Sequence, residues 1–194
     1  MHPGVSTDAA AFSPTERELQ RWVQAALKVA DASSSWQVAI CLMDERQMQE
    51  LNGSFRNKMH PTNCLSFPAY SPDEVAVMLK QVPCSAGNDN MTDSLGDIAL
   101  CSSVINKESG CWELPLAAHW AHLTIHSVLH LLGYDHLMPE ERKNMEAAET
   151  RAMLELGFAD PWSDRPDRPD RSNRSDKSDR SGAGSQQRFE LHGP

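Results

Sequence analysis

The sequence has no long apolar segment, no closely spaced cysteine pair and no excess of basic residues. No run of about 18 consecutive apolar residues occurs in its 194 residues, so the sequence predicts no membrane-spanning helix. The first residues lack a basic segment followed by an apolar core, and we therefore predict no secretory signal. The five cysteines form no C-x-x-C pair, and we interpret them as reduced thiols of a cytoplasmic protein.

Positive charge is also scarce. The chain carries 18 Lys and Arg residues against 27 Asp and Glu residues, which gives a formal net charge of −9. Residues 163–194 contain 7 basic and 6 acidic residues, so residues 1–162 have a net charge of −10. A domain of this charge has no general attraction for nucleic acid. RNA binding would require a local basic patch, a bound metal or a partner that presents the RNA.

Composition divides the chain into one folded domain and two tails. Residues 1–12 and residues 163–194 are predicted to be disordered. The second tail repeats triplets such as Asp-Arg-Pro and Asp-Arg-Ser, which have nothing to bury. Residues 13–162 form the predicted domain, and the 40% hydrophobic content of the chain is sufficient for a core.

Hydrophobic spacing and capping residues predict the elements of this domain. Ser13 is the expected N-cap of the first helix, with Pro14 at its first position and Glu16 completing a capping box. Arg56 and Lys58 are expected on a loop that begins at Asn52. The predicted strands are Trp36–Met43, Cys64–Phe67 and Leu95–Cys101; the predicted helices are Ser13 to about Ala30, one capped by Asp44, one around Asp73–Gln81, a weak one to about Lys107, Leu114–Leu132 and one from Pro139 to Gly157.

The most informative segment runs from His126 to His136 and contains three regularly placed histidines. His126 and His130 are four residues apart, so on a helix both rings project from one face. Gly133 allows the helix to end in a left-handed residue, after which the chain can bring His136 back to the same point. Three imidazoles that converge in this way leave one position open on a tetrahedral metal, as catalytic zinc sites do. We therefore predict a metal site.

Two further histidines, His119 and His122, lie upstream on nearly the same helical face. At about 1.5 Å per residue, His122 and His130 lie roughly 12 Å apart along the helix axis. Metal–nitrogen bonds are only about 2 Å long, so these two residues cannot share an ion. The trio of His126, His130 and His136 is the only one of these sets that closes around a metal. We assign His119 and His122 to packing or to contacts behind the ligands.

The spacing of the trio also fits the long zinc-protease signature. That signature requires a glutamate after the first histidine to act as the general base. Here the residue is Ser127, whose hydroxyl cannot accept a proton as a general base at neutral pH. A hydrolase that activates its nucleophile in another way is therefore favoured over a peptidase.

The sequence resembles the YbeY family of bacterial endoribonucleases that mature ribosomal RNA. The resemblance covers roughly Ser13 to Trp162, and the block that ends in Gly133-Tyr134-Asp135-His136 is its most specific part. The segments that carry it are Phe55-Arg56, Pro61-Thr62-Asn63, Leu65-Ser66-Phe67-Pro68, Leu95-Gly96-Asp97-Ile98, Ala118-His119-Trp120-Ala121-His122, His126 to His136, and Met145-Glu146 with Glu149 to Pro161.

The resemblance implies an α+β domain with a small mixed β-sheet, about five helices and a central metal-binding helix. It implies one Zn²⁺ held by His126, His130 and His136, and it places Arg56 and His126 among the catalytic residues. The implied activity is zinc-dependent cleavage of single-stranded RNA in 16S rRNA 3′-end maturation and ribosome quality control. The implied partners are ribosomal RNA and the small ribosomal subunit with its proteins, and no membrane. Arg56 would pair with the phosphate, and either water or the 2′-hydroxyl of the RNA would attack.

Two other functions remain open at this point. A ribosome-assembly factor whose zinc only stabilises the fold agrees with the acidic charge of the domain. A metalloprotease agrees with the spacing of the histidines and is disfavoured by Ser127.

Overall fold

The computed structural model describes residues 12–80 and 94–163, which contain six helices and three strands. The predicted tails, 1–12 and 163–194, lie almost wholly outside the described residues, as does the end of the connection between Ala69 and Ser94. The elements in chain order are α1 (Glu16–Val29), β1 (Gln37–Met43), α2 (Glu45–Arg56), β2 (Cys64–Pro68), α3 (Pro72–Lys80), β3 (Ser94–Cys101), α4 (Ser102–Cys111), α5 (Leu116–Leu131) and α6 (Pro139–Glu155).

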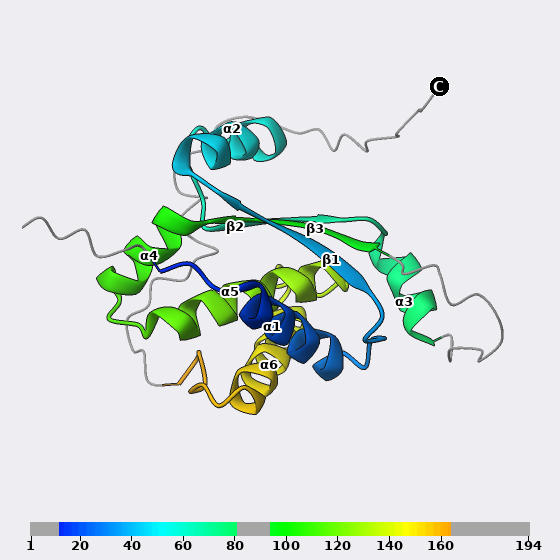
Figure 1. Ribbon diagram of the computed structural model, residues 1–194. Coiled ribbons are helices and arrows are strands. Elements are labelled where there is room, and N and C mark those ends of the chain that lie inside the picture. Colours follow the sequence, from blue (N-terminus) through cyan, green and yellow to red (C-terminus); the bar gives the residue numbers. More distant parts are fainter. Residues whose placement is uncertain (1–11, 81–93, 164–194) are drawn as a thin grey trace, which may run out of the picture. The chain divides into compact units, whose positions relative to one another are not determined.

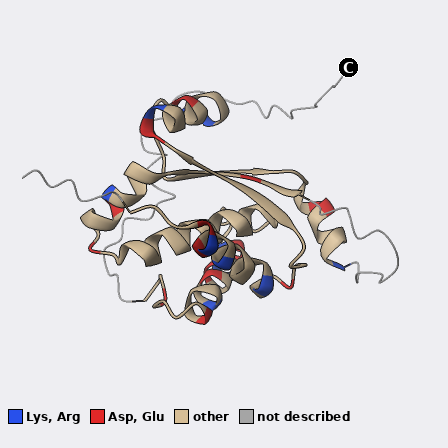
Figure 2. Ribbon diagram, viewed as in Figure 1, with Lys and Arg blue, Asp and Glu red and all other residues tan. Residues whose placement is uncertain are grey.

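The three strands form one mixed sheet in the order β1-β3-β2, with β3 in the centre. β1 runs parallel to β3, and β2 runs antiparallel to it. The predicted α+β fold with a small mixed sheet is therefore confirmed, with six helices rather than about five. The strands hold almost no charge, and the basic and acidic residues lie mostly on the helices (Figure 2).

Helices cover both faces of the sheet (Figure 1). On one face α1, α5 and α6 enclose the main core, in which Leu27, Trp120 and Leu129 are almost completely buried. On the other face α2 packs against the sheet through Met48, which joins a smaller apolar cluster with Leu65. None of the helices in the described segments is long and apolar enough to cross a membrane.

Helix α5 runs through the centre of the main core, as predicted. Eleven of its 16 residues are buried, and it contains no Asp, Glu, Lys or Arg. It packs against α1, α6 and β2 (Figure 1), and the Ser66 hydroxyl of β2 donates to the Ser127 carbonyl oxygen at 3.2 Å. A helix held on several sides can fix the direction of its side chains, which a metal site requires.

The close approach of β2 to β3 depends on Gly96. This residue has φ +137°, and a Cβ atom there would lie 2.3 Å from the Phe67 carbonyl oxygen. Only glycine fits such a position without movement of the backbone.

Three expectations about helix ends are wrong. Helix α4 runs to Cys111 rather than to about Lys107. The N-cap of α1 is Thr15 rather than Ser13: the Thr15 hydroxyl accepts from the Glu18 N–H at 3.3 Å, and the Thr15 N–H donates to Glu18 at 2.8 Å. Both residues start an S/T-x-x-E pattern, and the second pattern forms the box.

The segment from Asn52 is helical as far as Arg56, so Arg56 ends a helix and does not lie on a loop. The Gly53 position faces the Met59 sulfur, and Asn57 in the left-handed conformation (φ 55°) then ends the helix.

Candidate metal centre

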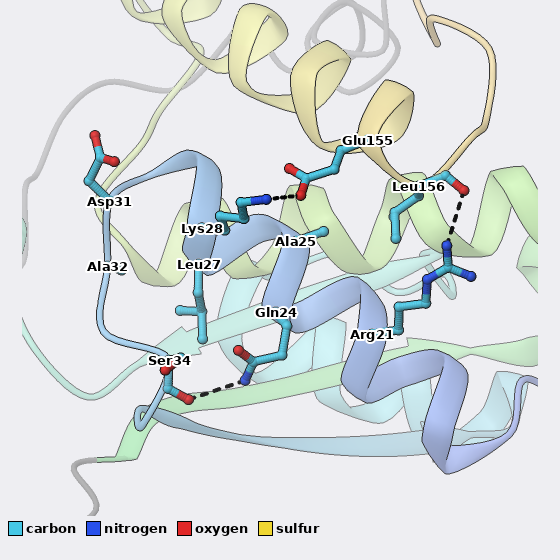
Figure 3. Close-up of a pocket in the computed structure, with 10 residues that line it drawn as sticks. All are labelled: Arg21, Gln24, Ala25, Leu27, Lys28, Asp31, Ala32, Ser34, Glu155 and Leu156. Atoms are coloured by element: carbon cyan, nitrogen blue, oxygen red, sulfur yellow. Dashed lines mark hydrogen bonds and ion pairs between the residues drawn. The ribbon is translucent and has the colours of Figure 1, made fainter.

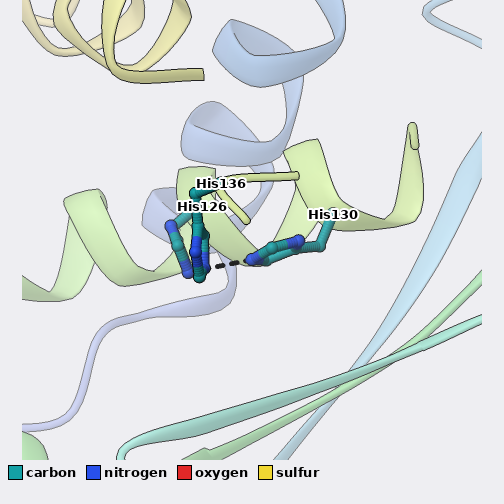
Figure 4. A group of neighbouring side chains, drawn as sticks. All are labelled: His126, His130 and His136. Carbon is teal, nitrogen blue, oxygen red and sulfur yellow. Dashed lines mark hydrogen bonds between the residues drawn. The ribbon is translucent and has the colours of Figure 1, made fainter. Parts of the chain in front are cut away.

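The end of α5 and the turn after it bring His126, His130 and His136 together (Figure 4). His126 and His130 lie one turn apart on α5, and Gly133 (φ +84°) reverses the chain beyond the helix. The Tyr134 N–H donates to the Leu129 carbonyl oxygen at 3.0 Å and fixes this turn. One potential ligand atom from each histidine lies within 4.8 Å of the other two.

Hydrogen bonds on the side of the His126 and His130 rings that points away from the cluster determine which nitrogen of each ring faces the cluster. His126 Nδ1 lies 2.7 Å from a Glu149 carboxylate oxygen, and His130 Nδ1 lies 3.0 Å from the Tyr134 carbonyl oxygen. Both partners are acceptors, so both Nδ1 atoms carry the proton and donate. The Nε2 atoms of His126 and His130 are then lone-pair donors for a metal, and they face each other at 3.1 Å.

Burial favours the neutral form of two imidazoles of the cluster, those of His130 and His136. Desolvation, with smaller contributions from His126 and His136, lowers the pKa of His130 from 6.5 to about 4. Desolvation, followed by His126, also lowers the pKa of His136. Neutral imidazole is the form that binds metals, so these shifts favour ligation at neutral pH.

The geometry of the three residues fits a metal ion. With metal–nitrogen bonds of about 2.0–2.1 Å, adjacent nitrogens in a tetrahedral site lie about 3.3 Å apart. The 3.1 Å between the Nε2 atoms of His126 and His130 is close to that spacing. Two lone pairs at this distance repel each other unless a cation or a proton lies between them. Three histidines leave a fourth position for water or substrate, as in catalytic zinc sites.

The sequence analysis assigned no role at the site to Glu149, a residue of α6 that is 1% exposed. Its two carboxylate oxygens lie 2.7 Å from His126 Nδ1 and 3.1 Å from His122 Nε2. Burial alone would raise the pKa of Glu149, but the hydrogen bonds from His122 and His126 outweigh it and hold the pKa well below its usual range. The sequence pattern could have indicated this residue, because Glu149 is a charged residue on the apolar face that Met145 and Ala152 define on α6.

His119 belongs to a separate polar network. It is 2% exposed, and its Nε2 lies 3.0 Å from a carboxylate oxygen of Glu108 on α4. The Asn63 amide donates to both oxygens of the same carboxylate, at 3.0 and 3.3 Å. His119 therefore anchors the segment before β2, while His122 contacts the carboxylate behind His126.

Arg56 lies exposed at the C-terminal end of α2. It makes no hydrogen bond or ion pair with any other residue of the described chain, and the structure records no contact between it and the three histidines. Its neighbour Phe55 is 65% exposed and packs edge-on against Phe67, with ring centroids 4.9 Å apart. Arg56 is thus free to bind an anion beside an exposed aromatic ring.

Ser127 and Asp135 flank the histidines in different ways. The Ser127 side chain is fully buried, and its hydroxyl oxygen has no hydrogen-bond partner among the described residues. Asp135 accepts from the His136 N–H at 2.7 Å and so fixes the turn that carries this histidine. Arg142 of α6 donates to the His136 carbonyl oxygen at 3.4 Å, which places a cation next to the same turn.

A small cavity in the described part of the chain adjoins the histidine turn. It has a volume of about 270 Å³, and Tyr134, Asp135 and residues of α3 line it. A larger cavity, about 670 Å³, lies between α1 and α6 (Figure 3). There Lys28 pairs with Glu155, and Arg21 donates to the Leu156 carbonyl oxygen at 3.5 Å. Both cations of the larger cavity are occupied by acceptors of this chain, so it is a poor phosphate site.

Comparison with known proteins agrees with the resemblance seen in the sequence. The family model described as Endoribonuclease YbeY matches residues 6–157. Two curated relatives from Pseudomonas putida, strains F1 and KT2440, are both named Endoribonuclease YbeY. Each is 42% identical to this chain over 159 residues, which cover 82% of this chain and 90% of the relative.

Among solved structures, the chain is similar to the solution structure of a Thermotoga maritima protein. The identity is 20%, the TM-score is 0.47, and the match covers 89% of this chain and 97% of that one. This similarity is too low to compare the two sites. The match to the family model and the 42% identity of the curated relatives are sufficient: the chain belongs to the YbeY family of endoribonucleases.

Proposed function

We propose that this protein is a zinc-dependent endoribonuclease that cleaves single-stranded RNA. We further propose that it acts in 16S rRNA 3′-end maturation and ribosome quality control, in the cytoplasm, with the small ribosomal subunit and its proteins as partners. The observation that carries the proposal is the cluster of His126, His130 and His136, which would leave one position of a bound tetrahedral metal open to a substrate. Membership of the YbeY family supports RNA as the substrate class.

The three histidines have a defined role in this proposal. His126, His130 and His136 would hold the ion, and as a ligand His126 would then lie close to the reacting phosphate. When bound, zinc would act as a Lewis acid that polarises a phosphate oxygen or a water molecule. Ser127 offers no general base, because its side chain is fully buried and is a hydroxyl. The nucleophile is therefore activated without a glutamate of the peptidase type, which also argues against a metalloprotease.

Arg56 is the proposed phosphate-binding residue. Its guanidinium is always charged and fits two phosphate oxygens at once, so it would stabilise the negative charge that develops during attack. The exposed ring of Phe55 next to it offers a face on which an unpaired base can stack. Such stacking is possible only for bases outside a duplex, which supports the preference for single strands.

The test is cleavage of a labelled single-stranded RNA by wild type, His130→Ala, Arg56→Ala and Arg46→Ala, with metal content measured on the same samples. Arg46 is the matched control, because it is a second exposed arginine of α2. We expect His130→Ala to lose both metal and activity. Arg56→Ala should keep its metal and lose about 10²–10³-fold in rate, the usual effect of removing one donor to a developing oxyanion. Arg46→Ala should behave as wild type.

Substrate and product analysis tests the remaining parts of the proposal. The same sequence in a duplex should resist cleavage, and a 16S rRNA precursor with an extended 3′ end should be cut. A 2′,3′-cyclic phosphate on the product would exclude direct attack by water. Equal activity in all four proteins would indicate a contaminating nuclease and refute the assignment of both sites.

A ribosome-assembly factor with a structural metal is the second candidate, because residues 1–162 carry a net charge of −10. That charge suits protein partners better than bare RNA. In this case chelation would unfold the protein, and Arg56→Ala would leave its role in ribosome assembly intact.

A further inference from the structure

A single carboxylate joins two histidines of α5 to helix α6. One oxygen of Glu149 accepts from His126 Nδ1 at 2.7 Å, and the other lies 3.1 Å from His122 Nε2. Glu149 is 1% exposed and His122 is 6% exposed, so water does not compete for these bonds. The two histidines are one helical turn apart, and Glu149 spans them from the facing helix. It therefore fixes both the direction and the proton of the His126 ring.

The position of Glu149 behind His126 decides which nitrogen of that ring is available. A carboxylate only accepts, so Nδ1 of His126 must carry the proton and Nε2 must carry the lone pair. His130 is oriented in the same manner by a backbone carbonyl, but that acceptor has no charge. Among the described residues, Glu149 is the one carboxylate with a recorded hydrogen bond to an imidazole of the cluster, and its negative charge makes the opposite nitrogen a stronger ligand.

We propose that Glu149 is a positioning residue for metal binding and that His122 holds Glu149 in place for this task. The inference rests on the metal dependence in the proposed function and assigns roles to two residues that do not touch the ion. His122 satisfies the second oxygen of a buried carboxylate, which would otherwise lack a partner in an apolar interface.

The C-terminal end of the described chain covers this bridge. The Trp162 ring meets the His122 ring edge-on, with centroids 5.5 Å apart and planes at 89°. The Asp160 carboxylate accepts from the Trp162 N–H and from the Thr150 hydroxyl, each at 2.9 Å, and so fixes the segment that carries the ring. Trp162 therefore shields the outer end of the His122–Glu149 pair from solvent.

The experiment compares the zinc affinity of the full chain in wild type, Glu149→Gln, His122→Gln and His119→Gln. Each protein is stripped of metal and titrated with zinc against a chromophoric chelator, and Co²⁺ absorption spectra report the ligand geometry. His119→Gln is the matched control, because His119 is also a buried α5 histidine bound to a glutamate, and that glutamate contacts none of the three clustered histidines. Thermal unfolding of the metal-free forms shows that each variant folds.

We expect Glu149→Gln to weaken zinc binding by about 10–100-fold, as is usual for loss of a partner behind a ligand, and to change the Co²⁺ spectrum. His122→Gln should weaken binding by a smaller factor, and His119→Gln should match wild type in both measurements. Wild-type affinity in Glu149→Gln, or an equal loss in His119→Gln, would overturn the proposal. If Glu149→Gln does not fold, the zinc affinity of His122→Gln tests the proposal instead. An affinity equal to that of wild type would then overturn it.

The zinc measurements do not depend on RNA cleavage. Wild type that binds zinc without cutting RNA, together with weak binding in Glu149→Gln, would refute the proposed nuclease and support the role of Glu149. Wild type that binds no zinc would overturn both.

Discussion

The low proton affinity of His130 predicts how the stability of the metal-free protein depends on pH. The pKa of this histidine is lowered from 6.5 to about 4, mainly by burial. Between these values the unfolded chain binds a proton at residue 130 and the folded chain does not. The free energy of unfolding therefore falls as the pH falls from 6.5 towards 4, and it is unaffected by this residue above neutral pH.

The size of the effect follows from the shift. At about 1.4 kcal/mol per pKa unit, the full contribution is at most about 3 kcal/mol. Between pH 7 and pH 5.5 linkage gives a loss of about 1 kcal/mol, and by pH 4.5 the loss is about 2 kcal/mol. For a domain of this size, a change of 1 kcal/mol moves the melting temperature by roughly 2–4 °C.

The assay is urea unfolding of the chelator-treated protein at pH 7, 5.5 and 4.5, in wild type and His130→Gln. Glutamine does not titrate, and it can still donate a hydrogen bond towards the Tyr134 carbonyl oxygen that His130 contacts. His136 has a pKa lowered in the same direction and remains in both proteins, so the difference between them isolates residue 130. Equal losses of stability in the two proteins between pH 7 and pH 5.5 would refute the reasoning.

Three further outcomes test the fold and the site. Gly96→Ala should destabilise the domain by about 3 kcal/mol or more in urea unfolding, because its Cβ would lie 2.3 Å from the Phe67 carbonyl oxygen. The control is Gly110→Ala in α4, whose Cβ would meet nothing within 4 Å, and it should be neutral or slightly stabilising. Thr15→Ala should reduce stability by about 1 kcal/mol through loss of the α1 cap, and an equal loss in the exposed Ser13→Ala would contradict the observed cap. Zinc at 100 times its dissociation constant should stabilise wild type by about 2.7 kcal/mol, and calorimetry should show no such gain in His130→Ala.

The parts of the site that the sequence predicted are those that local geometry determines. His126 and His130 share a helix face because they are four residues apart, and the turn at Gly133 sets the return of the chain to His136. Each of these steps spans only a few residues. The same holds for the strands. Each observed strand differs from the predicted one by one residue at one of its ends.

Features that depend on distant contacts were not predictable in this way. Arg56 was expected on a loop that begins at Asn52. In the fold, the Asn52 side chain donates to the His60 carbonyl oxygen at 2.7 Å, and the helix continues through Gly53. The partner of His126 is 23 residues away on another helix, and nothing in the spacing of the histidines points to Glu149.

The distribution of charge explains why the acidic domain and an RNA substrate are compatible. Helix α5 has no charged residue of its own, and the carboxylate nearest to its histidines is already paired with His122 and His126 inside the protein. In the described part of the chain the acidic residues lie on other elements, mostly on the other helices (Figure 2). A dication at the histidines, with Arg142 beside His136, would make this turn locally positive. Attraction for a phosphate would then depend on the loaded site rather than on the surface as a whole, so binding of RNA and binding of metal should be coupled.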